Sequence, residues 1–369
     1  MKKVVTIGGA TQDVFIKHEN SKMLQIYTKR TRKAFLIFEE GSKIEIKNLS
    51  YSTGGGATNA ASSFSRLGFS VSTIIKMGDD QQAEMIIKKL KKEGVDTSAI
   101  SKTKELNTGV SIIIPCLSGD RTVLAYRGAN TSLQKEDLNE ELIASCDQLY
   151  ITSLSGESSK LLPYITTLAK KHNVPVAINP GISQLAAGAP QIMESLPNID
   201  IFILNAQEAT EFMCTLTNLD TKLMRELQNE STIPEQKDAP QLMATTIRHQ
   251  GLCFSIHQYF QEILKRGPKI VVVTNGKEGV YVATNNKIYF HPSIKTNTVS
   301  TLGAGDSFGS CFVASLALGE SIEKAIINGV INSSSVIQYL DAKTGLLTLD
   351  ELAKQAKQSK RKHITIFPL

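Results

Sequence analysis

Cysteine, histidine and long apolar runs are scarce in this sequence, and each shortage excludes a class of protein. The five cysteines, an odd number, include no Cys-x-x-Cys pair, which favours reduced thiols over a disulfide framework or a zinc site. The six histidines form no His-Glu-x-x-His pattern, so histidine-centred metal chemistry has little support. No uncharged apolar stretch reaches the roughly 18 residues that a membrane span needs. An apolar strand-like run begins at Val4 with no cleavage signal before it, so we expect a cytoplasmic protein with no membrane partner.

The composition is otherwise that of an ordinary globular protein with a mild basic excess. The 369 residues are 41% hydrophobic and 21% charged, and 41 Lys and Arg against 35 Asp and Glu leave a net charge of +6. This length suits one large α/β unit with an appendage. The basic excess suits a small anionic ligand but is too weak to indicate a nucleic acid partner.

Short apolar runs alternate with helical patterns along most of the chain. Strand candidates are residues 4–7, 71–75, 148–151, 174–178, 201–204 and 269–273, and helical patterns at 59–67, 83–93 and 158–172 lie between some of them. This alternation predicts an α/β fold in three layers, with a mostly parallel central sheet covered by helices on both faces.

Two segments break this rhythm. Residues 33–39 and 43–49 are β-prone runs joined by Glu-Gly-Ser, and residues 111–116 and 122–126 flank a Leu-Ser-Gly-Asp turn signal at 117–120. We expect the segments 14–52 and 108–129 to form a small β-sheet lid, which leaves 1–13, 53–107 and 130–369 as the core. The open edges of such a sheet suit a second subunit, so a homodimer through the lid is one prediction.

Residues 215–267 fit neither pattern. Helical periodicity at 217–228 and 252–265 encloses a polar, proline-containing stretch at 229–240. We predict a helical insertion, either a surface insertion of the core or an extended helical hairpin. No residue pattern within it indicates a function.

The most informative run is Thr-Leu-Gly-Ala-Gly-Asp-Ser-Phe at 301–308. The small residues Gly303, Ala304 and Gly305 come just before a helical pattern, where free N–H groups and the positive end of the helix dipole attract an anion such as phosphate. Asp306 would lie in the first turn and could take a proton from an attacking hydroxyl. The spacing alone fits an ordinary helix start with Asp306 as a capping residue about equally well.

Five runs, in order along nearly the whole chain, resemble the signatures of one family. Run 301–308 resembles the C-terminal signature of the ribokinase/PfkB-type carbohydrate kinases, which include nucleoside kinases, and Gly-Gly-Gly-Ala-Thr-Asn-Ala-Ala at 54–61 followed by Arg-Leu-Gly resembles the N-terminal one. Gly78 and Asp80, with Gly-Val-Asp at 94–96, match the next segment. Asn-Ala-Gln-Glu at 205–208 resembles the family's Asn-x-x-Glu motif, and residues 273–279 resemble its nucleotide-site strand and turn. The resemblance implies a ribokinase-like fold and an ATP- and Mg²⁺-dependent kinase for a primary alcohol of a small sugar or nucleoside.

The resemblance also implies a role for each matched residue. Asp306 would be the catalytic base, with Gly303, Ala304 and Gly305 as the anion hole. The other roles are substrate binding for Asp13, Gly54, Gly55 and Asn59, nucleotide binding for Thr274, Gly276, Gly279 and Asn332, and ordering of Mg²⁺ for Asn205 and Glu208. Simpler alternatives are a turn or helix cap for Asp13, a flexible turn for the glycines, a helix cap for Asn205 and a polar helix residue for Asn332.

Two positions depart from the family pattern. Ser300 stands where the family usually has an aspartate, which leaves open how the loop is anchored and whether a monovalent cation such as K⁺ is needed. Ala83 replaces a glycine expected after Asp80. The alternative function is a catalytically silent ligand-binding regulatory protein on the same fold. A dinucleotide oxidoreductase is disfavoured because no Gly-x-Gly-x-x-Gly follows the first strand.

The sequence leaves the substrate open. A nucleoside would require an apolar or aromatic pocket for its base, for which Phe35, Phe38 and Tyr51 of the lid are available, although packing within the lid is their simpler role. A phosphosugar would require a further cation, for which Lys43 and Arg127 lie between motifs, although both suit a solvated surface.

Overall fold

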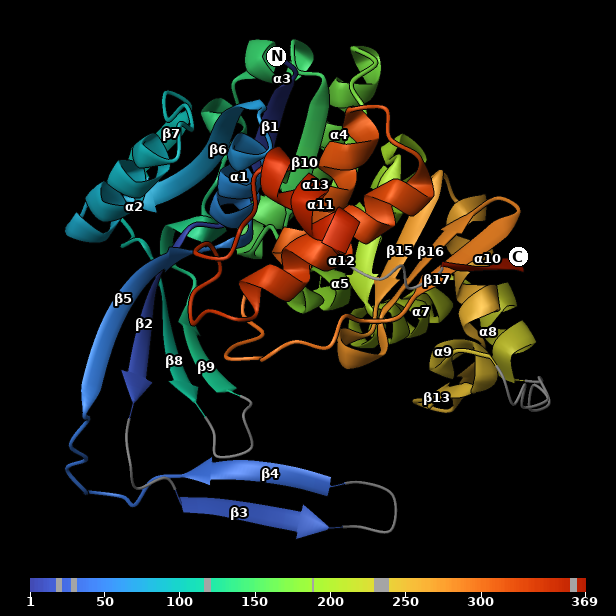
Figure 1. Cartoon of the computed structure of the whole chain (residues 1–369), viewed down its shortest axis with the longest axis horizontal. Coiled ribbons are helices and arrows are strands. Elements are labelled where there is room, and N and C mark those ends of the chain that lie inside the picture. Colours follow the sequence, from blue (N-terminus) through green and yellow to red (C-terminus); the bar gives the residue numbers. More distant parts are fainter. Residues whose placement is uncertain (18–21, 28–31, 116–120, 188, 229–238, 359–363) are drawn as a thin grey trace.

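The structure is a computed structural model that describes residues 1–17, 22–27, 32–115, 121–187, 189–228, 239–358 and 364–369. Its centre, within these residues, is a ten-stranded sheet with the strand order β18-β17-β16-β15-β12-β11-β10-β1-β6-β7 (Figure 1). The strands are β1 (Lys3–Ile7), β6 (Ser70–Gly78), β7 (Ile100–Thr103), β10 (Gln148–Thr152), β11 (Val176–Asn179), β12 (Ile201–Asn205), β15 (Ile270–Thr274), β16 (Val280–Thr284), β17 (Lys287–His291) and β18 (Thr365–Pro368).

The seven strands from β7 to β15 run parallel, and β16, β17 and β18 continue the sheet antiparallel. Strand β10 is buried at all five positions, and β1 and β12 at four of five, as expected for parallel strands with helices on both faces. All six predicted strands are therefore confirmed, with ends that differ by up to three residues.

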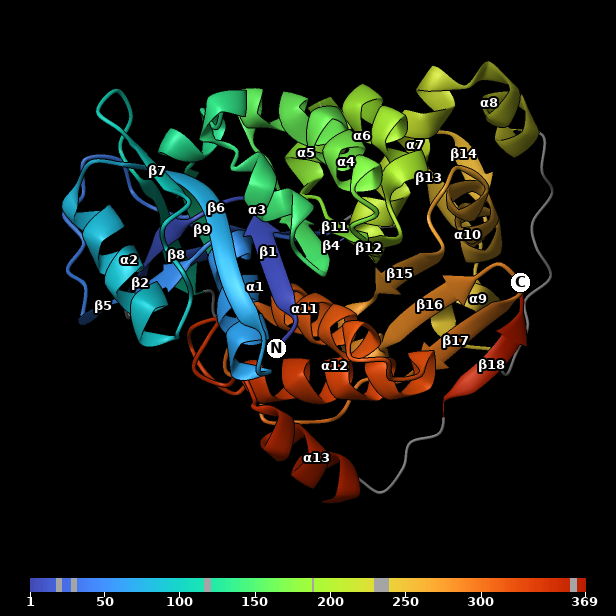
Figure 2. The same cartoon turned by 90° about the horizontal axis from the view of Figure 1, so that it is seen from above.

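Helices cover both faces of this sheet (Figure 2). One layer holds α3 (Glu140–Ala144), α4 (Leu162–Lys171), α5 (Ile182–Ala187), α6 (Ala189–Ser195), α7 (Ala206–Leu219) and α10 (Ile256–Lys265). The other holds α1 (Gly56–Arg66), α2 (Gln81–Lys92), α11 (Ala304–Ala317), α12 (Ile322–Val336) and α13 (Leu349–Gln358). Two separate clusters of buried apolar side chains fill the spaces on the two sides, which confirms the predicted three-layer α/β architecture.

A second sheet projects from the body (Figure 1). It has the order β5-β2-β8-β9, built from β2 (Thr11–Lys17), β5 (Asn48–Gly54), β8 (Gly109–Pro115) and β9 (Arg121–Tyr126). The predicted pairing of 111–116 with 122–126 is present as β8 and β9, while the turn signal at 117–120 lies outside the described residues. Strand β2 crosses the boundary predicted at residue 13, so Asp13 lies on the projecting sheet.

The prediction for 33–49 is partly wrong. Strand β4 (Arg32–Ile37) pairs with β3 (Lys22–Tyr27) in a separate two-stranded arm, and β5 begins only at Asn48 and pairs with β2. Residues 43–47 alternate apolar and polar but form no strand, and Ile44 and Ile46 stay exposed. Each neighbouring β-prone run has a strand partner, and 43–47 serve as the connection between the arm and the sheet.

The segment 215–267 is less helical than predicted. Helix α8 (Thr221–Gln228) and the single turn α9 (Gln241–Ala244) are followed by a hairpin of β13 (Ile247–His249) and β14 (Leu252–Phe254), and 229–238 lie outside the described residues. Gln250 and Gly251 both have positive φ, the geometry of a two-residue hairpin turn. Because Ser255 caps the next helix, α10 begins at Ile256, four residues later than predicted.

No helix in the described parts of the chain is long and apolar enough to cross a membrane.

Candidate active site

The predicted site residues meet where the parallel strands end and α11 begins. Asn205 ends β12 and pairs in register with Thr274, which ends β15. The carboxyl ends of parallel strands meet at one edge of a sheet, which is where ligands bind in open α/β folds. Asp306, in the first turn of α11, lies close enough to Asp13 and Glu208 to raise the pKa of each.

The start of α11 has the geometry of an anion site. Gly303 precedes the helix with a φ of 73°, and a Cβ atom there would lie 2.4 Å from Cβ of Ala342, so only glycine fits. At Gly305 a Cβ would meet nothing within 4 Å, so the first turn borders open space. The Ala304 N–H donates to the Thr301 carbonyl at 3.3 Å, and the N–H groups of Gly305 and Asp306 have no partner within the helix. A phosphate group of ATP fits this end of a 14-residue helix.

Ser300 anchors the loop before this helix. Its hydroxyl accepts a hydrogen bond from the Leu302 N–H at 3.2 Å, and its own N–H donates to the carbonyl of Ile337 at 3.1 Å. The serine that replaces the family's aspartate therefore still holds the local geometry of the loop.

Asp306 contacts Asn59 rather than a backbone cap. Nδ2 of Asn59 donates to Oδ2 of Asp306 at 2.8 Å. Oδ1 of Asn59 is buried and has no hydrogen-bond partner, which leaves an acceptor that a substrate hydroxyl can satisfy. Burial raises the pKa of Asp306 above its ordinary value, while the bond from Asn59 and the charge of Lys343 lower it.

Asp13 faces the same space from the middle of β2, so it is neither a turn residue nor a helix cap. The Thr11 hydroxyl donates to Oδ1 of Asp13 at 2.9 Å, and the carboxylate is only 4% exposed. Burial raises the pKa of Asp13, and the nearby charge of Asp306 raises it further. The side chain of Ser111 also hydrogen-bonds to Asp13. A carboxylate can accept about four hydrogen bonds, so Asp13 can still accept from a ligand hydroxyl.

The predicted substrate glycines are required by close packing. A Cβ atom at Gly54 would lie 2.0 Å from Oδ2 of Asp13. Gly55 has a φ of 92°, and a Cβ there would lie 2.4 Å from the carbonyl oxygen of Gly9. The turn thus brings backbone against Asp13 and starts α1, which carries Asn59.

Asn205 and Glu208 form a capping box at the start of α7. The Glu208 N–H donates to Oδ1 of Asn205, and the Asn205 N–H donates to Oε2 of Glu208, both at 2.9 Å. The helix-cap alternative is thus realised, and it fixes a partly exposed carboxylate beside Asp306. Burial raises the pKa of Glu208, and Asp306 adds to that rise. Such a carboxylate fits Mg²⁺, which keeps several of its waters and needs few protein ligands.

Three of the four predicted nucleotide residues lie at the turn between β15 and β16, where the Asn275 N–H donates to the Gly279 carbonyl at 2.8 Å, and the fourth, Asn332, lies on α12. Thr274 lies half-buried at the sheet edge, and Gly276, with a φ of 50°, borders open space in the following turn. At Gly279 a Cβ would lie 2.2 Å from the carbonyl oxygen of His291, so this glycine allows β16 to approach β17. Asn332 is fully buried between helices, where it donates to the Ser307 carbonyl at 2.9 Å and accepts from the Leu347 N–H at 3.0 Å. These two bonds hold α12 against α11 and against the loop before α13.

The structure adds two residues that no motif indicated. Arg121 of β9 donates from Nη1 to the hydroxyl of Thr301, which joins the projecting sheet to the anion loop. Lys343 lies in the loop after α12, buried near Asp13 and Asp306. An Arg in a β-prone run and a Lys between Ala and Thr both look like surface residues in sequence, so no pattern could have selected them.

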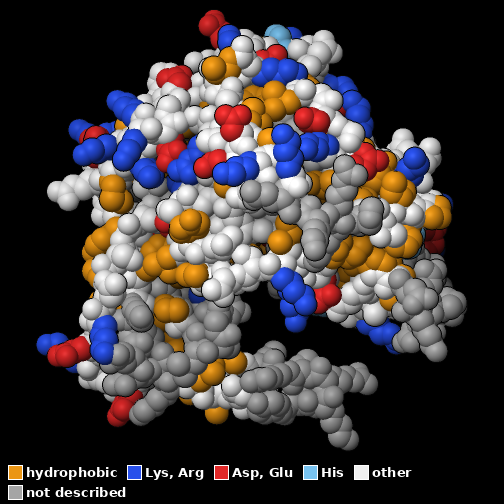
Figure 3. Space-filling model, in the orientation of Figure 1, with side chains coloured by type: hydrophobic (Ala, Val, Ile, Leu, Met, Phe, Trp, Pro, Cys, Tyr) orange, Lys and Arg blue, Asp and Glu red, His pale blue; other side chains and the backbone are white. Residues whose placement is uncertain are grey.

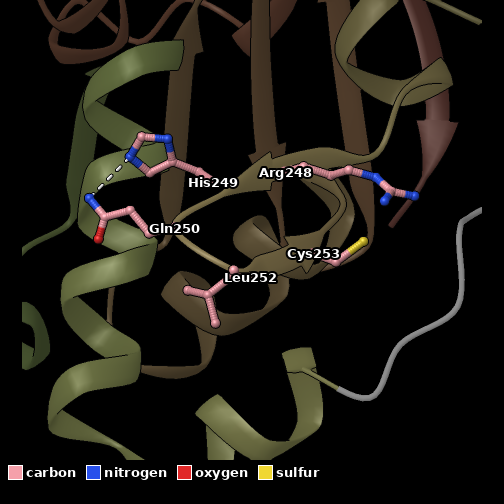
Figure 4. A pocket seen from close by; sticks show the side chains of 6 residues that line it. Arg248, His249, Gln250, Leu252 and Cys253 are labelled. Carbon is pink, nitrogen blue, oxygen red and sulfur yellow. Dashed lines mark hydrogen bonds between the residues drawn. The ribbon is translucent and has the colours of Figure 1, made fainter. Parts of the chain in front are cut away.

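A shallow hollow in the inserted segment lies outside this site. It is lined by Arg248, His249, Gln250, Gly251, Leu252 and Cys253 of the β13–β14 hairpin (Figure 4). His249 pairs with Glu211 of α7 at 3.0 Å and with the side chain of Gln250 at 3.2 Å. None of the predicted site residues contributes to this hollow.

Comparison with known proteins agrees with this geometry. The pfkB family carbohydrate kinase model matches residues 1–233 and 254–349, and the gap falls within the inserted segment. Ribokinase of Staphylococcus aureus is 26% identical over 352 residues, which cover 95% of this chain and 98% of the relative. The 5-dehydro-2-deoxygluconokinase of Bacillus licheniformis is 24% identical and covers 81% of this chain and 85% of its own.

Solved structures share the fold. Arabidopsis thaliana ribokinase complexed with ribose and ATP has a TM-score of 0.72 at 19% identity, and covers 96% of this chain and 99% of its own. A nucleoside kinase of Methanocaldococcus jannaschii has a TM-score of 0.71 at 19% identity, with coverages of 97% and 99%. The ribokinase-like fold predicted from the sequence is confirmed. With the family model matched over most of its length, this chain belongs to the pfkB family of carbohydrate kinases.

Proposed function

We propose that this kinase transfers the γ-phosphoryl group of ATP, with Mg²⁺, to a primary hydroxyl of a small sugar, and that Asp306 is the catalytic base. One observation carries the proposal. Asp306 lies in the first turn of α11 beside open space, and it is bonded to Asn59, whose Oδ1 is buried without a partner. One substrate hydroxyl would donate to Oδ1 of Asn59, and the attacking hydroxyl beside it would present its proton to Asp306.

Each group of site residues has its own role in the proposed transfer. MgATP, when bound, supplies the phosphoryl group. Asp306 accepts the proton of the attacking hydroxyl, and the N–H groups at the start of α11 stabilise negative charge on the transferring group. Asp13 and Asn59 hold the other hydroxyls, while Glu208 and Asn205 orient metal-bound water. The projecting sheet acts as a lid that keeps bulk water from the site.

A sugar suits the inner face of the lid better than a nucleoside does. Strand register places Ser52 and Ser111 beside Asp13 on one face, and the Ser52 hydroxyl is buried without a partner. These groups match a ligand rich in hydroxyls. Phe35, Phe38 and Tyr51, the candidates for a base pocket, are all more than 40% exposed, and the register places Tyr51 on the opposite face from Asp13. Ribokinase and sugar-acid kinase relatives fit the same substrate class.

The alternative of a silent regulatory protein gains no support from the site. The site contains the Asn59–Asp306 bond, the open turn at Gly305 and the carboxylate of Glu208 beside Asp306. A protein that only binds a ligand would not need this combination. We also propose a cytoplasmic location, because the reaction consumes ATP and the four cysteines within the described residues are all free thiols.

The decisive experiment is a coupled assay of ADP release with Mg²⁺. Ribose, deoxyribose, fructose, a fructose phosphate, 2-keto-3-deoxygluconate and adenosine are each compared, with KCl or NaCl as the salt to test for a monovalent-cation requirement. We expect a pentose or sugar acid to react, and Asp306→Asn to lower kcat about a thousandfold or more without changing the far-ultraviolet circular dichroism. Near-normal turnover by Asp306→Asn would overturn the assignment of the base, and ATP binding without transfer to any alcohol would favour the regulatory protein.

A further inference from the structure

Lys343 is a buried lysine whose charged end is held entirely by neutral oxygen atoms. It lies in the loop between α12 and α13 and is 2% exposed. Its Nζ donates to the carbonyl of Thr53 at 2.9 Å, to the Thr53 hydroxyl at 2.8 Å and to the Thr58 hydroxyl at 2.9 Å. An ammonium group has three N–H donors, so these three bonds use all of them.

The three oxygen atoms come from two elements on the proposed substrate side of the site. Thr53 lies at the end of β5 in the lid sheet, and Thr58 lies in the first turn of α1. The Thr58 hydroxyl in turn donates to the carbonyl of Gly54 at 2.7 Å. Lys343 is therefore linked through one side chain to the glycine turn that packs against Asp13.

The other side of the same loop borders the anion site. Ala342 is the residue that a Cβ atom at Gly303 would strike, so the backbone next to Lys343 lies against the start of α11. Lys343 thus connects the lid sheet, the substrate turn and the phosphate end of α11, three parts that are far apart in the sequence.

The charges around Lys343 also indicate a role in the site. Burial lowers the pKa of Lys343 to about 7, and Asp13, Glu93 and Asp341 oppose that fall while Lys89 adds to it. The positive charge of Lys343 lowers the pKa of both Asp13 and Asp306. A buried charge without a bonded carboxylate is costly, and replacing it with an apolar residue often stabilises a protein. Packing alone therefore does not account for a lysine here.

We propose that the ammonium group of Lys343 is a built-in monovalent cation that positions the substrate turn and the lid strand against α11. The proposal rests on the proposed function, since it assigns Lys343 to the same reaction as a positioning residue. Lys343 touches neither the reacting hydroxyl nor the phosphoryl group. Its effect passes through Thr53, Thr58 and Gly54 and through the electrostatic field at Asp13 and Asp306.

The test replaces the charge in two ways. Lys343→Met keeps the shape of the side chain and removes the cation, and Lys343→Ala leaves space lined by the three oxygen atoms. Lys269→Met, which removes a charge from a side chain that is 76% exposed, is the control. Each protein is assayed with its sugar and with ATP, and Lys343→Ala is also assayed with n-propylammonium, tetramethylammonium or propan-1-ol. Only n-propylammonium combines the length of the removed atoms with a charge and three N–H donors.

We expect Lys343→Met to lower kcat/KM for the sugar about tenfold or more and to move the acidic limb of its pH profile upward, while KM for ATP changes less than about twofold. n-Propylammonium should restore at least about a third of the loss in Lys343→Ala, and the other two additives should not. Unchanged kinetics in Lys343→Met, or equal rescue by propan-1-ol, would overturn the proposal.

A second readout does not depend on the proposed function. n-Propylammonium should raise the unfolding temperature of Lys343→Ala more than that of the wild type, and tetramethylammonium should not, because only the former can bond to the three oxygens. Absence of this stabilisation overturns the built-in cation even if no sugar reacts. If n-propylammonium stabilises Lys343→Ala but the wild type phosphorylates no alcohol, the cation site stands and only the proposed reaction is rejected.

Discussion

Asn59 and Asp306, 247 residues apart in the chain, are joined by a hydrogen bond of 2.8 Å from Nδ2 to Oδ2. Asn59 lies on α1, directly after the glycine turn, and Asp306 lies on α11, directly after the anion loop. The bond therefore fixes the substrate side of the site relative to the phosphate side. In the proposed mechanism this bond also occupies one oxygen of Asp306, so that the other oxygen accepts the proton.

Removing this bond should impair catalysis more than stability. Asn59→Leu preserves much of the volume, and we expect kcat/KM for the sugar to fall about a hundredfold, because both the orientation of Asp306 and the substrate acceptor Oδ1 are lost. The acidic limb of the rate profile should move to higher pH, since the bond from Asn59 lowers the pKa of Asp306. The control is Asn328→Leu, which removes a comparable buried bond to Ser315. Equal kinetic losses in both variants would contradict the specific role of Asn59.

Asp13→Asn should make the protein more stable and less active. Because burial raises the folded-state pKa of Asp13 above 3.8, ionising it costs stability as the pH rises through the raised value. The neutral variant, which keeps an acceptor for Thr11, should unfold at a higher temperature than the wild type at neutral pH. The difference should shrink as the pH falls towards 3.8, when both side chains are uncharged. Calorimetry across this range checks the sign, and KM for the sugar should rise at least about tenfold.

Glu208→Gln should weaken the response to Mg²⁺. The amide cannot attract the hydration shell of the metal ion as a carboxylate does, so the Mg²⁺ concentration for half-maximal rate should rise about tenfold, with KM for the sugar unchanged. Glu211→Gln, on the same helix and paired with His249, is the control. A titration of rate against Mg²⁺ at fixed ATP distinguishes the two. Identical titration curves for Glu208→Gln and the wild type would remove Glu208 from the metal site.

We propose that a second copy of the chain covers the outer face of the lid sheet. Strand register places four apolar side chains on the face opposite Asp13, namely Leu49, Tyr51, Leu124 and Tyr126. Each of them is more than 40% exposed. Apolar side chains are also visible over this sheet in Figure 3. Such an apolar sheet face suits a subunit contact. Sedimentation should give a dimer for the wild type and a monomer for Leu124→Glu, while Leu219→Glu, at the end of α7, should remain dimeric. A wild-type monomer at micromolar concentration would reject the interface.

The start of α11 was predictable because its constraints are local. Gly303 is required by its positive φ and by the contact that a Cβ would make with Ala342, and at Gly305 the same turn borders open space, so the motif itself indicates the geometry. The six core strands were predictable for a similar reason, since burial on both faces demands continuous apolar runs.

Long-range contacts explain what the sequence did not reveal. Residues 43–47 alternate like a strand, yet strand formation depends on a partner, and β4 pairs with β3 instead. Lys343 has a polar neighbourhood in sequence, and its burial depends on Thr53 and Thr58, about 290 residues away. Asn332 shows the converse, because a buried amide between two helices has the same local pattern as one that reaches a ligand.

The contact between Arg121 and Thr301 has a consequence for the timing of turnover. Arg121 belongs to the projecting sheet and Thr301 to the loop before α11, so we propose that opening of the lid requires this bond to break. A phosphorylated sugar would leave only after the bond breaks, and the anion loop would lose its brace at the same moment. Release of product and loosening of the loop before α11 would then occur together, because both depend on the bond made by Arg121.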